Sequence, residues 1–139
     1  MFNYKNSDRY QQKKIDQLAK KLAYFWQPNE PNIGDYLALD TVQQMLHLEN
    51  RFVLDKINKK NKLLSIGSVL HFAQNNDVVW GTGRNGKVAE KLHKFTSLDV
   101  RAVRGPLTRE YLASKNITCP EIYGDPAILT PLFYPELMM

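Results

Sequence analysis

The chain has 139 residues, of which 43% are hydrophobic and 24% are charged, and its formal net charge at neutral pH is +5. This length predicts one domain that can bury a hydrophobic core, and the composition is that of an ordinary globular protein. The sequence contains no apolar run of about 18 residues and only one cysteine, Cys119, which excludes an internal disulfide. We therefore expect no integral membrane segment and a reducing, cytoplasmic location.

The positive charge is not arranged like a nucleic-acid-binding surface. The lysines occur in short groups typical of solvated helix and loop faces, without interleaved aromatic residues or a DNA-reading motif. These groups are Lys13-Lys14, Lys20-Lys21, Lys56, Lys59, Lys60 and Lys62. A mildly basic protein that handles small anions has the same charge balance, so we expect no nucleic acid partner.

The N-terminal third predicts an extension, a strand and a helix. Residues 1–18 are polar, lack the apolar core of a signal peptide, and are expected to precede one α/β domain over residues 19–139. The apolar run Leu22–Trp26 predicts a strand, and after a loop rich in proline and asparagine Asp35 is predicted to cap a helix that runs to about Leu48. The residues at helical spacing that should face the sheet are Ala38, Val42, Met45 and Leu46.

The middle of the chain alternates short apolar runs with turns. Residues 51–61 fit either a partly buried helix or an edge strand. Lys62–Ile66 and Asp77–Trp80 predict two further strands, and Val69–Ala73 predicts a short helix between them. Residues 87–94 fit a short helix or an irregular crossover.

The stretch from residue 98 to residue 127 predicts a strand, a helix and extended chain. Asp99–Val103 is the strand, and Pro106 suits the first position of the helix because its missing N–H group would be unpaired there. The helix should end near residues 114–116, and Glu121–Tyr123 should be extended. The apolar stripe of this helix is Leu107, Tyr111 and Leu112. Alternating strands and helices predict an α/β domain, a Rossmann-like parallel sheet with flanking helices and right-handed crossovers.

Arg104 is the candidate anion-binding residue. It lies at the carboxyl end of a predicted strand and directly before a predicted helix. Ligands of open parallel sheets bind at this edge, and a guanidinium beside a helix N-terminus suits a phosphate or a carboxylate. The alternative is an ordinary ion pair between Arg104 and a neighbouring carboxylate.

Gly81-x-Gly83-x-x-Gly86 matches the dinucleotide fingerprint by spacing. The fingerprint normally opens the first strand–helix unit, whereas here it follows the third predicted strand, and Asn85-Gly86 has the composition of a turn. NAD(P) binding is therefore not favoured. The same glycines would let the backbone approach another ligand, with Arg84 nearby.

Other candidates carry a functional and a structural interpretation. Gly67-Ser68 ends a predicted strand, either lining a cleft or forming a tight turn. Asn32-x-Gly34-Asp35 is either a helix cap with its turn or a loop that faces the same cleft, and Asp125 before Pro126 is most simply a helix cap. The histidines lack metal-ligand spacing and Cys119 has no evident activating partner, so no metal site or catalytic residue is assigned.

Several blocks, in this order, resemble the polysaccharide pyruvyl transferase family. They are Asn32-Ile33-Gly34-Asp35, LLSIGSVL at 63–70, VVWGTG at 78–83, VRAVRGPLTREYL at 100–112 and YGDPAILTPLFYP at 123–135. The similarity covers roughly residues 20 to 135. The resemblance implies the N-terminal domain of a glycosyltransferase-B-like fold with two Rossmann-type domains.

The resemblance also implies an activity. Members of that family transfer a pyruvyl group from phosphoenolpyruvate to two hydroxyls of a sugar in an exopolysaccharide or cell-wall polymer, which forms a ketal and releases phosphate. Phosphoenolpyruvate and a saccharide acceptor are the implied partners, with no cofactor beyond the donor. A truncated chain that lacks the family's C-terminal domain is the implied organisation.

The residues matched to the family's motifs are Asn32, Gly34, Asp35, Gly67, Ser68, Gly81, Gly83, Arg104 and Asp125. Arg104 is the expected anion contact, and the general acid and base remain open. The alternative function is a non-catalytic domain, related to glycosyltransferases, that binds an anion or a nucleotide sugar.

Overall fold

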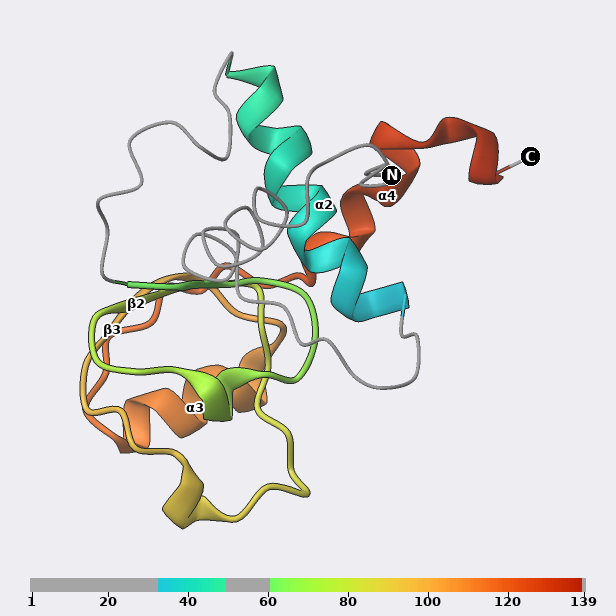
Figure 1. The fold of residues 1–139 in the computed structure, drawn as a ribbon. Helices are drawn as coiled ribbons and strands as arrows, with labels where there is room; N and C mark the ends of the chain where they lie inside the picture. Colours follow the sequence, from blue (N-terminus) through green and yellow to red (C-terminus); the bar gives the residue numbers. More distant parts are fainter. Residues whose placement is uncertain (1–32, 50–60, 139) are drawn as a thin grey trace, which may run out of the picture.

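The computed structural model describes residues 33–49 and 61–138 (Figure 1). The predicted extension over residues 1–18, the predicted strand Leu22–Trp26, most of the ambiguous segment 51–61 and the candidate residue Asn32 lie outside the described residues. None of the helices in the described segments is long and apolar enough to cross a bilayer.

In the part of the chain that the structure describes, the centre of the fold is a parallel sheet of three strands. They are β1 (Leu63–Leu64), β2 (Asp77–Trp80) and β3 (Leu98–Ala102), and they pair in chain order. This confirms the predicted parallel α/β class. Strand β2 has the predicted bounds, β1 is shorter than the predicted Lys62–Ile66, and β3 lies one residue earlier than predicted.

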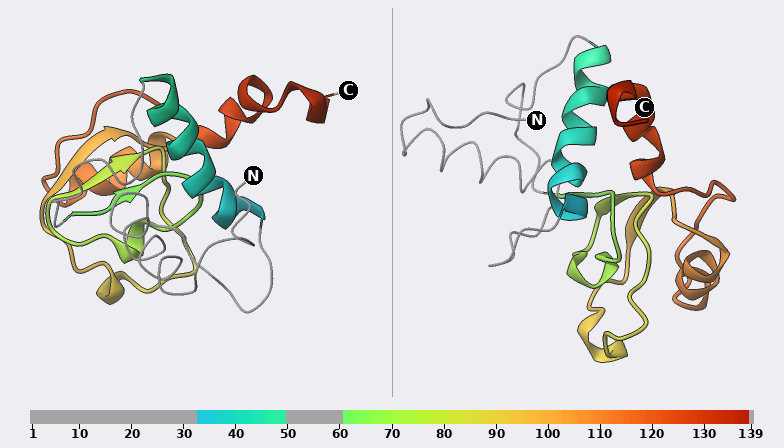
Figure 2. Two further views of the ribbon diagram at one scale, coloured as in Figure 1. Left: turned by 45° about the horizontal axis from the view of Figure 1, so that its top comes forward. Right: turned by 90° about the vertical axis from the view of Figure 1, so that its right-hand side faces the viewer.

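The two faces of the sheet build two separate cores, because neighbouring strand residues point to opposite sides. Leu64 and Val79 are fully buried on the face covered by α3 (Pro106–Ser114), whereas Leu63 and Trp80 pack on the face covered by α2 (Ile33–Leu48). Figures 1 and 2 show α2 and α4 on one side of the sheet and α3 on the other. Covering both faces is the usual requirement of a parallel sheet.

Helix α2 begins at Ile33, so Asp35 lies in its first turn and not at the predicted cap position. Ala38 and Val42 are buried against the sheet and Leu46 is partly buried, as predicted. Met45 is 36% exposed, which corrects the prediction that it faces the sheet. The buried stripe runs through residues 38, 39, 42 and 46, and Met45 lies at its margin.

Helix α3 begins at Pro106 and ends at Ser114, close to its predicted bounds. Tyr111 and Leu112 are buried as predicted, but Leu107 is 80% exposed and Thr108 is only 4% exposed. The inward face therefore follows positions 108, 111 and 112, which have the i, i+3, i+4 spacing of one helix face. Leu107 belongs to the outer face of the first turn.

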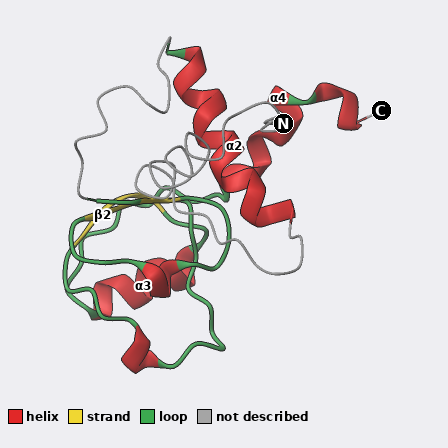
Figure 3. Ribbon diagram, viewed as in Figure 1, coloured by secondary structure: helices red, strands yellow, loops and turns green. Residues whose placement is uncertain are grey.

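The rest of the described chain is loop interrupted by short helical turns (Figure 3). The predicted helix at 69–73 is the 3-10 turn η2 (Leu70–Phe72), and the crossover at 87–94 contains η3 (Glu90–Leu92). The predicted extended segment at 121–123 makes one parallel bridge, between Val103 and Tyr123. The chain then enters η4 (Pro126–Leu129), α4 (Thr130–Phe133) and η5 (Pro135–Met138).

A hydrogen bond between Tyr134 and Asp40 connects the C-terminal turns to α2. The Tyr134 hydroxyl donates to Asp40 Oδ2 at 2.6 Å and accepts from Gln44 Nε2 at 3.3 Å. Asp40 is only 4% exposed, so its carboxyl group depends on protein partners. The bond to Asp40, followed by burial, raises the pKa of Tyr134.

Tyr134→Phe is therefore expected to lower the free energy of unfolding by about 1–3 kcal/mol at neutral pH. Because the pKa of Tyr134 is raised in the fold, its contribution is present below about pH 10 and is lost as the pH rises through the folded-state pKa. Urea unfolding at pH 7 and at alkaline pH measures this. The wild type should lose more stability than the variant on the alkaline side, and equal losses would contradict the assignment. Tyr111, whose pKa burial also raises, contributes equally to both proteins.

Candidate anion-binding site

Three strand ends meet at the carboxyl edge of the sheet. Beyond β1 the chain turns at Gly67, and beyond β2 it turns at Gly81, with φ angles of 101° and 98°. These left-handed conformations favour glycine. The Gly83 amide donates to the Gly67 carbonyl at 3.1 Å, and the Arg104 amide donates to the Thr82 carbonyl at 3.2 Å. The three turns are thus joined by backbone hydrogen bonds.

The guanidinium of Arg104 lies across these turns. Its Nη1 donates to Ser68 Oγ and its Nη2 donates to the Arg84 carbonyl at 3.2 Å. A Cβ atom built at Gly83 would overlap the guanidinium carbon, so only glycine leaves room for Arg104 in this position. The fold therefore brings together five of the residues predicted for the site, which are Gly67, Ser68, Gly81, Gly83 and Arg104.

Arg104 is exposed and is free of carboxylate partners in the part of the chain that the structure describes. A guanidinium has five N–H donors, and Ser68 and Arg84 each take one. Helix α3 begins two residues later, and its cap residue Gly105 has no side chain to satisfy the first N–H groups. The edge thus presents free donors and the positive end of a helix dipole, which together suit an anion.

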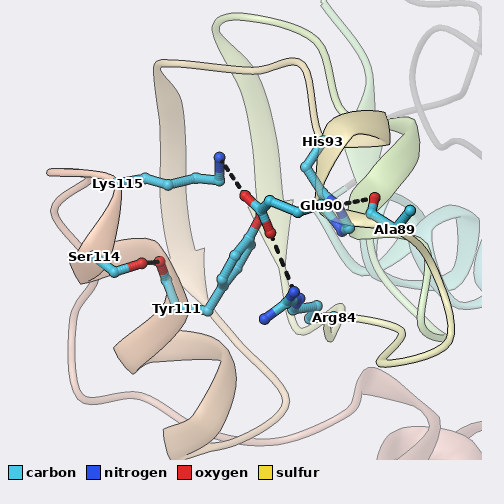
Figure 4. Close-up of polar contacts among 7 residues, drawn as sticks. All are labelled: Arg84, Ala89, Glu90, His93, Tyr111, Ser114 and Lys115. Atoms are coloured by element: carbon cyan, nitrogen blue, oxygen red, sulfur yellow. Dashed lines mark hydrogen bonds and ion pairs between the residues drawn. The ribbon is translucent and has the colours of Figure 1, made fainter.

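The side chain of Arg84 belongs to a different cluster (Figure 4). Its guanidinium stacks 4.0 Å from the centre of the Tyr111 ring, and its Nη2 pairs with Glu90 Oε2 at 3.1 Å. Only the main chain of Arg84 reaches the candidate site, through its carbonyl on Arg104. The sequence expected Arg84 near the ligand, and the structure gives its charge an acidic partner instead.

Glu90 is the centre of that cluster. Its Oε1 accepts from Lys115 Nζ and from the Tyr111 hydroxyl, each at 2.9 Å. The bond from Lys115, then that from Tyr111, lowers the pKa of Glu90, while the bond to Glu90 raises the pKa of Lys115. Figure 4 shows these side chains converging between the crossover and α3. The cluster connects the crossover to α3, and both of its cationic side chains, Arg84 and Lys115, pair with Glu90.

Asp125 acts as a helix cap. Its Oδ1 accepts from the Ala127 amide at 2.9 Å at the start of η4. This turn lies against the site, because a Cβ atom at Gly81 would be 2.8 Å from the Gly124 carbonyl oxygen and would overlap Pro126. Gly34 and Asp35 lie in the first turn of α2, where only the backbone is described.

The described residues hold no group of three or more histidine, cysteine or acidic side chains that could bind a metal ion. Cys119 is buried, and burial raises the pKa of its thiol, which disfavours the nucleophilic thiolate. Burial also lowers the pKa of His71.

After β2 the glycines lead into a turn and η3, so the glycine-rich pattern lacks the α-helix that holds a pyrophosphate in dinucleotide-binding folds.

Two residues that touch this site, Thr82 and Thr108, were not among the candidates from the sequence. Thr82 is fully buried between the strand-end glycines, and Thr108 is buried on the inner face of α3. The sequence could have indicated Thr82 as a site residue, because it is a polar residue between two glycines directly after a predicted strand. No sequence feature indicated Thr108, because the apolar pattern predicted Leu107 on the inner face of the helix.

Comparisons with models of known protein families, with curated proteins and with solved structures found no match to this chain.

Proposed function

We propose that this chain binds phosphoenolpyruvate at the Arg104 edge and carries the N-terminal Rossmann-like domain of a polysaccharide pyruvyl transferase with a glycosyltransferase-B-like fold. The observation that carries the proposal is the guanidinium of Arg104. It is held by Ser68 and the Arg84 carbonyl beside the N-terminus of α3, and it faces solvent without a carboxylate partner among the described residues.

The donor has the charge that this edge would bind. Phosphoenolpyruvate carries a carboxylate and a phosphate on three carbons, and a guanidinium can bind either group through two parallel hydrogen bonds. The N–H groups of the first turn of α3 supply further donors for an anion. Arg104 would thus orient the donor and stabilise the negative charge of the departing phosphate.

The proposed reaction joins two sugar hydroxyls to C2 of the donor. A general acid protonates C3, which leaves an oxocarbenium-like centre at C2, and the first hydroxyl adds there as a base takes its proton. The C2–O bond to the phosphate then breaks with its electron pair on the leaving group. The second hydroxyl adds to C2 with loss of its proton, which gives the pyruvate ketal and free phosphate.

Titration of the 139-residue protein with phosphoenolpyruvate tests donor binding, by calorimetry or by amide NMR shifts. Saturable binding is expected, and Arg104→Gln should weaken it by roughly tenfold to 150-fold, the value of hydrogen bonds to a charged group. Arg101→Gln is the matched control, because Arg101 lies on β3 shortly before Arg104 and pairs with Asp99, and its substitution removes the same charge. It should leave the affinity within about twofold, since exposed charges act weakly at a distance in physiological salt.

Three results would go against the proposal. Absence of phosphoenolpyruvate binding contradicts it directly, and equal losses in Arg104→Gln and Arg101→Gln would reduce the effect to net charge. Binding of a nucleotide sugar with no response to phosphoenolpyruvate would favour a glycosyltransferase-like binding domain.

A further inference from the structure

Each of the two turns that supply an acceptor to Arg104 is hydrogen-bonded to a buried threonine hydroxyl. Ser68 Oγ and the Arg84 carbonyl accept the two guanidinium hydrogen bonds. Thr82 is 0% exposed and Thr108 is 4% exposed. The Thr82 hydroxyl bonds the main chain on both sides of Ser68, and the Thr108 hydroxyl bonds the amide of Arg84. The turns that hold the exposed guanidinium are therefore themselves held by buried side chains.

Thr82 secures the turn that carries Ser68. Its Oγ1 donates to the Gly67 carbonyl at 2.7 Å and accepts from the Val69 amide at 3.2 Å. The hydroxyl thus forms hydrogen bonds with the residues on both sides of Ser68. The carbonyl of the same residue accepts from the Arg104 amide at 3.2 Å, so Thr82 sets Ser68 and Arg104 in register.

Thr108 secures the turn that carries the second acceptor. Its Oγ1 accepts from the Arg84 amide at 3.2 Å, and the carbonyl of Arg84 accepts from Arg104 Nη2 at 3.2 Å. Thr108 belongs to the first turn of α3, which begins directly after Arg104 and Gly105. The helix therefore holds the partner of the arginine that precedes it.

We propose that Thr82 and Thr108 are positioning residues that hold Arg104 in its anion-binding conformation. This inference rests on the proposed function, because it assigns the ordered guanidinium to donor binding. A free arginine side chain samples many rotamers and loses that freedom when it binds a ligand. Buried hydroxyls that fix both acceptors order the side chain before the donor arrives, which raises affinity without touching the donor.

The first measurement compares donor affinity in isosteric and conservative variants. Thr82→Val and Thr108→Val should each weaken phosphoenolpyruvate binding by roughly threefold to tenfold, the factor expected for ordering one flexible side chain. Thr82→Ser keeps the hydroxyl and should restore most of the affinity. Thr41→Val, at a buried threonine of α2, is the matched control and should bind as the wild type does.

The second measurement separates positioning from a general loss of structure. In an Arg104→Gln background, Thr82→Val should cause no further loss of affinity, because the side chain that it positions is absent. A further loss of similar size, or failure of Thr82→Ser to restore binding, would overturn the proposal. Circular dichroism verifies that each variant is folded, and Thr108→Val tests the same claim if Thr82→Val does not fold.

A third measurement needs no ligand. The Nη–Hη NMR signals of Arg104 should be distinct and slow to exchange in the wild type, because Nη1 and Nη2 donate to Ser68 and the Arg84 carbonyl. They should move toward free-arginine values in both valine variants. An unchanged signal in both folded variants would overturn the positioning role. A changed signal in a protein that does not bind phosphoenolpyruvate would retain the positioning of Arg104 and reject the proposed function.

Discussion

Gly81→Ala is expected to lower the free energy of unfolding by about 2–6 kcal/mol. A left-handed backbone costs a side-chain-bearing residue about 1–3 kcal/mol, and overpacking costs a similar amount. Gly81 has a φ of 98°, and its added Cβ would be 2.8 Å from the Gly124 carbonyl oxygen and would overlap the ring of Pro126. A backbone carbonyl and a proline ring cannot rotate away, so the strand end or η4 has to move.

Urea unfolding followed by circular dichroism gives this difference directly. Gly86→Ala is the matched control, because nothing lies within 4 Å of a Cβ atom at Gly86 and its backbone is not left-handed. The control should stay within about 0.5 kcal/mol of the wild type. Equal stabilities of the two variants would contradict the packing of η4 against the end of β2.

Gly83→Ala is expected to keep the fold and to weaken donor binding. The three atoms nearest to the added Cβ all belong to the flexible end of Arg104, and the backbone at Gly83 is not left-handed. The guanidinium can swing into solvent, so we expect a stability change below about 1 kcal/mol. Because the swing breaks the contacts with Ser68 and the Arg84 carbonyl, affinity for phosphoenolpyruvate should fall by roughly tenfold or more.

The same titration and unfolding experiments measure both effects of Gly83→Ala. A double variant, Gly83→Ala with Arg104→Gln, should bind no more weakly than Arg104→Gln alone, since both changes remove one guanidinium from the edge. Wild-type affinity in Gly83→Ala would show that the observed position of Arg104 does not matter for the donor. A large loss of stability would instead mean that Gly83 supports the fold as Gly81 does.

The two glycines share a sequence pattern and differ in their neighbours. Both lie at the end of β2, two residues apart, and the sequence assigned both to one ligand-facing edge. Gly81 faces a backbone carbonyl and a proline ring, whereas Gly83 faces a long side chain. Sequence spacing identifies the edge, but only the contacts distinguish a glycine needed for packing from one needed to admit Arg104.

Much of the candidate site follows from topology that the sequence predicts. Apolar runs bounded by glycine located the strands, and the carboxyl ends of parallel strands must share one edge. That rule alone brings Gly67-Ser68, Gly81, Gly83 and Arg104 together, and their closeness in the structure agrees with it. The likeness to pyruvyl transferases remains a prediction.

Local sequence patterns were enough to predict strand β2 and the start of α3 at Pro106, because periodicity and proline act within a few neighbouring residues. The partner of each side chain, in contrast, depends on how the elements pack in three dimensions. The guanidinium of Arg84 pairs with Glu90, and Thr108 lies on the inner face of α3 where Leu107 was predicted. Arg104 has no carboxylate partner in the described segments, and its Nη2 donates to the Arg84 carbonyl. These outcomes depend on the rotation of a helix against a sheet and on charges that are distant in sequence, which a local pattern does not contain.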